Sequence, residues 1–111
     1  MAKVLVVNND IDTMSLIQHA LEKRRYNVIY TGNGNAVPQI MKEFQPDVVL
    51  VDILQNEVVE SLKANIETSK VPVLLMTGYT YPESSSYYSD DIIHKPFNIG
   101  LLETKIERLL I

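Results

Sequence analysis

The sequence contains no cysteine, fewer basic than acidic residues, and no long apolar run. Without cysteine the chain cannot form disulfides, zinc–thiolate sites or a cysteine nucleophile. The formal net charge of −4 gives no electrostatic reason to bind nucleic acid or an anionic membrane. No apolar run approaches the roughly 20 residues that span a bilayer. Because Met1–Lys3 leads directly into a predicted strand, without room for a signal peptide, we expect a soluble cytoplasmic protein.

The length and composition predict one folded domain over residues 1–111. Independent cores usually run to about 100–150 residues, close to the length of this chain. Apolar residues make up 46% of the sequence, enough for a packed core and too many for a disordered regulator.

The apolar pattern predicts alternating strands and helices. Short runs, most of them rich in valine and isoleucine, indicate strands buried on both faces of a parallel sheet. These runs are Val4–Val7, Val28–Tyr30, Val48–Val51, Val71–Met76 and Ile92–Ile93. Helical spacing predicts helices over Asp12–Arg25 (with Asp12 as N-cap), Asn35–Phe44, Glu57–Glu67 and Asn98–Leu110. Residues 78–90 are rich in serine and predict a turn or an irregular loop. The alternation predicts right-handed βαβ crossovers and an α/β sandwich.

Polar residues follow the predicted strands at the ends where parallel sheets bind ligands. They include the trio Asn8–Asp10, then Asp52, Thr77 and Lys95. A carboxylate, a hydroxyl and an ammonium in one crevice can hold a phosphoryl group: the lysine supplies charge, the threonine a hydrogen bond and the aspartate the nucleophile.

Four segments make the chain resemble the response-regulator receiver domains of bacterial two-component systems, in order and over its whole length. They are Lys3–Val7, Pro46–Asp52, Val71–Gly78 and Lys95–Phe97. The resemblance implies a flavodoxin-like (CheY-like) three-layer sandwich around a five-stranded parallel sheet of order 2-1-3-4-5. The shortened stretch between Thr77 and Lys95 implies that the fourth helix is short or missing.

The resemblance also implies a signalling function rather than an enzymatic one. Asp52 would be the phospho-acceptor, Thr77 the hydroxyl that turns toward the phosphoryl group, and Lys95 the amine that pairs with it. The peptide bond before Pro96 would be cis and would direct the lysine. The implied partners are a histidine kinase or a phosphotransfer protein, and receivers often form homodimers.

The sequence departs from the family at the metal site. Typical receivers end the first strand with two acidic residues that help to bind Mg²⁺, whereas this chain has Asn8 and Asn9. Because Mg²⁺ favours carboxylate and water oxygens, we expect weak or absent metal binding and impaired phosphoryl transfer. Asp10 could compensate only if its loop shifted. Leu54 is expected to offer its backbone carbonyl at the metal position, although the loop after Asp52 is shortened.

A further departure lies at the position of the switch aromatic, which is Ile92 in this chain. Without an aromatic side chain, coupling from phosphate to the output surface should be weakened. Two hypotheses therefore stay open. One is a phosphorylated receiver with impaired activation; the other is a pseudo-receiver that binds a protein partner without phosphorylation.

A third, remote hypothesis is a flavodoxin-like cofactor-binding protein, suggested by the glycines of Gly32–Gly34. Val37 stands where the third glycine of a dinucleotide fingerprint belongs, and the preceding strand is the wrong one. Asn33–Gly34 is better interpreted as a turn into the second helix. The sequence does not decide whether the chain is a stand-alone regulator or part of a larger protein.

Overall fold

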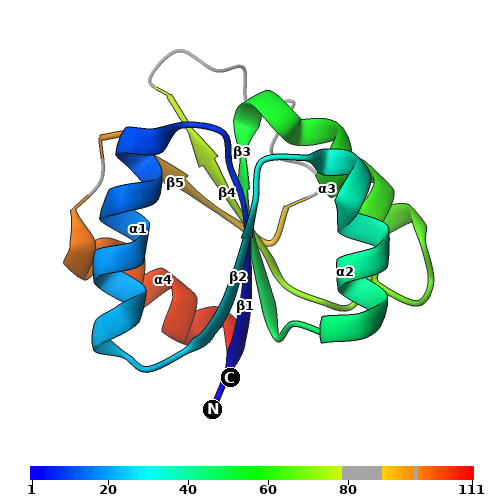
Figure 1. Cartoon of the computed structure of the whole chain (residues 1–111), viewed down its shortest axis with the longest axis horizontal. Helices are drawn as coiled ribbons and strands as arrows, with labels where there is room; N and C mark the ends of the chain where they lie inside the picture. The colour runs from blue at the N-terminus through cyan, green and yellow to red at the C-terminus, as the bar shows by residue number, and fades with distance from the viewer. Residues whose placement is uncertain (79–88, 97) are drawn as a thin grey trace.

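The computed structural model describes residues 1–78, 89–96 and 98–111 and contains one parallel sheet between two helical layers (Figure 1). The strand order is β2-β1-β3-β4-β5, which confirms the predicted topology. The strands are β1 (Lys3–Val7), β2 (Asn27–Thr31), β3 (Val48–Asp52), β4 (Val73–Thr77) and β5 (Asp91–His94). The helices are α1 (Ile11–Lys23), α2 (Val37–Phe44), α3 (Asn56–Ala64) and α4 (Ile99–Leu109), and two short 3₁₀ helices are η1 (Gly34–Ala36) and η2 (Ile53–Gln55).

Alternate residues of each central strand face opposite helical layers. Val4 and Val6 of β1 belong to the core beneath α1 and α4, whereas Leu5 and Val7 belong to the core beneath α2 and α3. Strands β1, β3 and β4 are buried on both faces, which explains their unbroken apolar runs. Figure 1 shows α1 and α4 on one side of the sheet and α2 and α3 on the other.

The first helix begins earlier than expected, and the predicted N-cap is wrong. Asp10, not Asp12, is the N-cap residue: its carboxylate accepts from the backbone N–H of Asp12 and from the hydroxyl of Thr13. Asp12 lies in the first turn, where a negative charge suits the helix dipole. The pattern of apolar residues identified the helix, but several polar residues in the preceding loop could have capped it.

The other predicted helices are shorter in the structure. Helix α2 is preceded by η1 rather than starting at Asn35, because Asn33 caps that 3₁₀ turn through its side chain. Helix α3 ends at Ala64 instead of Glu67, because Asn65 starts a turn in which its side chain accepts from the backbone of Glu67. Local asparagine hydrogen bonds compete with the helix at both places.

The end of α3 is joined to the start of β4 by a largely buried lysine that the sequence pattern does not predict. The Lys63 ammonium donates to the backbone carbonyls of Ser69 (3.1 Å) and Val71 (2.9 Å). It also pairs with the Asp90 carboxylate at 2.7 Å, and the same carboxylate oxygen accepts from the Val73 N–H. This contact holds the residues that lead into β4 and β5. The irregular segment predicted between these strands lies largely outside the described residues.

Candidate phospho-acceptor site at the carboxyl edge of the sheet

Asp52 is the last residue of β3, the central strand of the sheet. It pairs with Met76 of β4, and only 3% of its surface is exposed. Asn8 follows Val7, which pairs with Val51, so Asn8 and Asp52 leave adjacent strands side by side. A carboxylate this deeply buried needs hydrogen bonds and a counter-charge.

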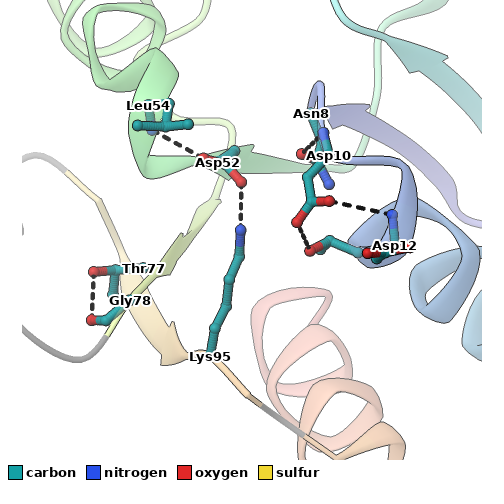
Figure 2. Close-up of polar contacts among 9 residues, drawn as sticks. Asn8, Asp10, Asp12, Asp52, Leu54, Thr77, Gly78 and Lys95 are labelled. Atoms are coloured by element: carbon teal, nitrogen blue, oxygen red, sulfur yellow. Dashed lines mark hydrogen bonds and ion pairs between the residues drawn. The ribbon is translucent and has the colours of Figure 1, made fainter.

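Lys95 supplies that counter-charge. Its ammonium lies 2.5 Å from Oδ2 of Asp52, and Figure 2 shows the lysine side chain extending from the end of β5 toward the carboxylate. Oδ1 of Asp52 accepts a hydrogen bond from the backbone N–H of Leu54 at 2.9 Å. Both oxygens of Asp52 are therefore engaged, one by a charge and one by the first turn after the strand.

Leu54 contributes its backbone N–H to this site. The sequence pattern does not predict this hydrogen bond. The short loop after Asp52 folds into the 3₁₀ helix η2, and Asp52 is the N-cap of that turn. The Leu54 side chain is 84% exposed. An aspartate at the end of a strand and directly before a short turn was the available signal in the sequence.

Thr77 lies at the end of β4, and its hydroxyl bonds within its own loop rather than to the Asp52–Lys95 ion pair. Its hydroxyl donates to the carbonyl of Gly78 at 3.1 Å, and Figure 2 shows these two residues apart from the ion pair. The backbone N–H of Lys95 donates to the Thr77 carbonyl at 2.6 Å, which ties the ends of β4 and β5 together. The peptide bond between Lys95 and Pro96 is cis.

Asn8 faces the same edge of the sheet and is 2% exposed. Its Oδ1 accepts from the backbone N–H of Asp10 at 2.8 Å, which fixes the orientation of the amide. The Nδ2 atom is buried and has no hydrogen-bond partner among the described residues. The unpartnered atom of Asn8 is thus a hydrogen-bond donor.

Asn9 is turned toward the loop after β2 rather than grouped with Asp52. A Cβ atom added to Gly32 would lie 2.1 Å from Oδ1 of Asn9, so the asparagine amide covers this glycine. The Gln55 side chain donates to the Gly32 carbonyl at 3.0 Å. The loops after β1, β2 and β3 therefore meet at Gly32 through neutral amide groups.

Asp10 lies beside the site but serves helix α1. Its hydrogen bond from the Thr13 hydroxyl, at 2.5 Å, lowers the pKa of the carboxyl below its ordinary value of 3.8. Burial raises this pKa, but by less than the Thr13 hydrogen bond lowers it, and the backbone N–H of Asp12 and the positive charge of Lys95 add smaller lowering effects. The structure places Asn8, Asp52 and Lys95 together, with Asp10 close enough to sense the lysine.

Ile92, at the position of the switch aromatic, lies in β5 and is half-buried.

Away from this site, a groove of about 1080 Å³ lies between α2 and α3 and includes Met41, Gln55 and Leu62 in its lining. Neither Asp52 nor Lys95 lines the groove, so it is separate from the candidate site.

The family model described as the response regulator receiver domain matches residues 4–107. The chain therefore belongs to the receiver-domain family of two-component signalling, and this membership replaces the flavodoxin-like, cofactor-binding alternative. Receiver domains are in general signalling modules without enzymatic activity, and they interact with histidine kinases and phosphotransfer proteins. In the described part of the chain, no helix is long and apolar enough to cross a membrane.

Several relatives are similar over nearly the whole chain. The transcriptional regulatory protein CpxR of Escherichia coli is 28% identical over 99% of this chain and 50% of its own length. The response regulator receiver protein CpdR of Brucella abortus is 26% identical over 100% of this chain and 98% of its own length. A probable cyclic di-GMP phosphodiesterase of Vibrio cholerae is 26% identical over 93% of this chain, but the chain spans only 25% of that protein. The chain thus spans half or less of the length of CpxR and of the phosphodiesterase.

Solved structures show the same fold. The signal receiver domain of a histidine kinase from Syntrophus aciditrophicus has a TM-score of 0.90 at 24% identity, covering 99% of this chain and 90% of its own. The chemotaxis response regulator CheY4 of Vibrio cholerae has a TM-score of 0.88 at 24% identity, covering 99% of both chains. These matches confirm the predicted CheY-like topology.

Receiver domains in general bind Mg²⁺ at an acidic site, and the donor set of this chain departs from that pattern. Mg²⁺ favours negatively charged oxygen ligands in near-octahedral geometry, whereas the amides at the end of β1 offer only neutral oxygens. The Asn8 atom that lacks a partner among the described residues is an N–H donor, which repels a cation, and Asn9 lies over Gly32. Within the ranges that the structure describes, no three acidic or histidine side chains gather into a metal site.

Proposed function

We propose that this domain is a phosphorelay receiver in which Asp52 is the phospho-acceptor and in which activation is impaired by Asn8 and Asn9. The observation that carries the proposal is the buried Asp52 carboxylate with the Lys95 ammonium 2.5 Å from Oδ2. An oxygen of Asp52 would attack the phosphorus of a phosphohistidine donor, the P–N bond would break, and the leaving imidazole nitrogen would take up a proton from solvent.

The side chains of this site have separable roles in that reaction. Lys95 would move from the carboxylate to the oxygens of the incoming phosphoryl group and offset their negative charge. The Leu54 N–H would hold the remaining carboxylate oxygen in place. The Thr77 hydroxyl would have to leave the Gly78 carbonyl before it could donate to the phosphoryl group.

Slow transfer follows from the charges around Asp52. A divalent ion normally reduces repulsion between the acceptor carboxylate and the donor, and it stabilises charge that develops during transfer. With amides at positions 8 and 9, binding of Mg²⁺ should be weak or absent. The ammonium of Lys95 must first be released from Asp52, which further slows attack.

The second candidate is a pseudo-receiver that recognises a protein partner without phosphorylation. It is supported by the engagement of both Asp52 oxygens and by Ile92 at the position of the switch aromatic. In this case the partner would bind the unmodified fold, and a homodimer is one form that such a partner could take. A role in the cytoplasm fits either candidate.

Intact-mass measurement separates the two candidates. The chain is incubated with Mg²⁺ and a small phosphodonor such as acetyl phosphate, beside Asp52→Asn and a matched control, Asp47→Asn. The first candidate predicts slow addition of one phosphoryl group to the parent chain and to Asp47→Asn, but none to Asp52→Asn. Absence of modification in all three chains, even on prolonged incubation, would favour the pseudo-receiver.

A further inference from the structure

The carboxylate oxygens of Asp52 and Asp10, at the carboxyl edge of the sheet, are all engaged by donors of the chain itself. Asp52 accepts from Leu54 and Lys95, and Asp10 accepts from Asp12 and Thr13. A metal ion could gain a carboxylate ligand here only by sharing an oxygen that already accepts a hydrogen bond or by displacing its donor. Such displacement is costly at Asp52, where the carboxylate is almost completely buried.

The amide of Asn8 cannot substitute for a missing carboxylate ligand. Its Oδ1 is held by the backbone N–H of Asp10, at 2.8 Å, in the turn that starts helix α1. Reversing the amide would place two N–H groups against each other, so the orientation is fixed by the backbone. The atom left without a partner among the described residues is Nδ2, whose hydrogens carry partial positive charge and oppose a cation.

From these contacts we infer that the Lys95 ammonium is the resident cation of this site and takes the place of a dissociable divalent ion. The inference deepens the proposed function, on which it rests, by assigning the regulation of the site: its charge balance is supplied within the chain and does not respond to Mg²⁺. Asp52 and Lys95 carry opposite unit charges that cancel, the residues at positions 8 and 9 add none, and the negative charge of the nearby Asp10 is engaged by the donors of the first turn of α1. Attraction of a second cation is correspondingly small.

The ammonium is suited to this role by its position. Its side chain is 25% exposed, whereas that of Asp52 is 4% exposed, so the lysine reaches a buried carboxylate from a partly exposed position. The Lys95 backbone is hydrogen-bonded to Thr77 at the end of β4, which limits the loss of entropy on pairing. A tethered cation also has a high effective concentration compared with a free ion.

Thermal unfolding followed by circular dichroism tests the inference without any phosphoryl transfer. Because a ligand that binds only the folded state raises the Tm, a titration with MgCl₂ is compared with NaCl at equal ionic strength. We expect no difference between the two salts for the parent chain. A saturable rise in Tm specific to Mg²⁺, lost in Asp52→Asn, would overturn the inference.

The double variant Asn8→Asp/Asn9→Asp serves as the matched positive control. In metal-free buffer its Tm should fall below that of the parent chain, because the new carboxylate at position 8 would be an unpaired charge at a buried position. Addition of Mg²⁺ should then raise its Tm. Equal insensitivity of the double variant and the parent chain to Mg²⁺ would contradict the account, because the amides would not be what keeps the metal out.

A second readout avoids reliance on variants that could fail to fold. The ¹H–¹⁵N resonance of the Lys95 ammonium in the parent chain should remain at its position when Mg²⁺ is added, while a shift upon titration would show displacement of the lysine by metal. A chain that never accepts a phosphoryl group would still give these expected results. Failure of this inference and failure of the proposed function are therefore distinguishable.

Discussion

The Lys95 ammonium and the Asp52 carboxylate, which are 43 residues apart in the sequence, meet at 2.5 Å at the carboxyl edge of the sheet. Strands β3 and β5 bring them there from either side of β4. The pair forms because a buried carboxylate requires a counter-charge and because Lys95 follows directly on the last residue of β5. The Asp52–Lys95 ion pair therefore contributes both to the stability of the fold and to the proposed phosphoryl transfer.

Removal of the lysine should destabilise the domain. Lys95→Ala leaves the Asp52 carboxylate buried with a single hydrogen bond, and we expect a loss of roughly 2–4 kcal/mol in the free energy of unfolding, limited by the partial exposure of the lysine. Urea denaturation measures this loss. The double variant Asp52→Asn/Lys95→Ala should recover much of it, because no unpaired charge remains; equal losses in the single and double variants would show that the charges do not interact.

Loss of the Lys63 contact should weaken the attachment of α3 to β4. Lys63→Met retains apolar bulk but leaves two backbone carbonyls and Asp90 without their donor, so we expect a cost of about 1–3 kcal/mol. Lys70→Met, in the adjacent turn, is the control and should change stability by less than about 0.5 kcal/mol. Similar effects of the two substitutions in chemical denaturation would argue against a specific role for Lys63.

Asp10 and Asp12 should differ in their effect on helix α1. Asp10→Ala removes the acceptor for Asp12 and Thr13 and should lower the Tm clearly, whereas Asp12→Ala removes only a favourable charge in the first turn. Thermal unfolding of the two variants measures the difference. A larger fall for Asp12→Ala would restore Asp12 as the N-cap, contrary to the structure.

The stability contributed by Asp10 should also depend on pH. Its pKa is lower in the folded state than the ordinary 3.8, so its contribution is complete above that value and is lost as the pH falls through the lowered pKa. Asp10→Asn keeps an oxygen acceptor but cannot titrate. The difference in Tm between the parent chain and Asp10→Asn should therefore shrink under acid conditions, and a difference that grows there would contradict the assigned direction.

Much of the fold could be predicted from the sequence, because β1, β3 and β4 are buried on both faces and form unbroken apolar runs. The strand order follows from the resemblance to receiver domains, whereas the meeting of Asp52 and Lys95 is already predicted by their positions at the carboxyl ends of parallel strands. The helix ends could not be placed well, since Asn33, Asn65 and Asp10 each form local hydrogen bonds that compete with or cap a helix.

Side-chain directions at the site were beyond the sequence as well. The turn of Asn9 toward Gly32 depends on the approach of the loop after β2, and the Thr77 hydroxyl has a carbonyl within reach in its own loop. The sequence alone does not distinguish these contacts, with Gly32 and with the Gly78 carbonyl, from contacts with Asp52. The sequence likewise predicts a role for the backbone carbonyl of Leu54. It does not predict that the Leu54 N–H donates to the Asp52 carboxylate.

The rate at which Asp52 gains a phosphoryl group, compared between the parent chain and Asn8→Asp/Asn9→Asp in the presence of Mg²⁺, tests the central claim most directly. Restoring two carboxylates should let the metal bind and should raise the rate by about tenfold or more, which corresponds to roughly 1.4 kcal/mol of barrier. Intact-mass time courses should show slow modification of the parent chain, faster modification of the double variant, and none when Asp52→Asn is added to either. Modification that persists without Asp52, or that is no faster with the acidic pair restored, would contradict the account.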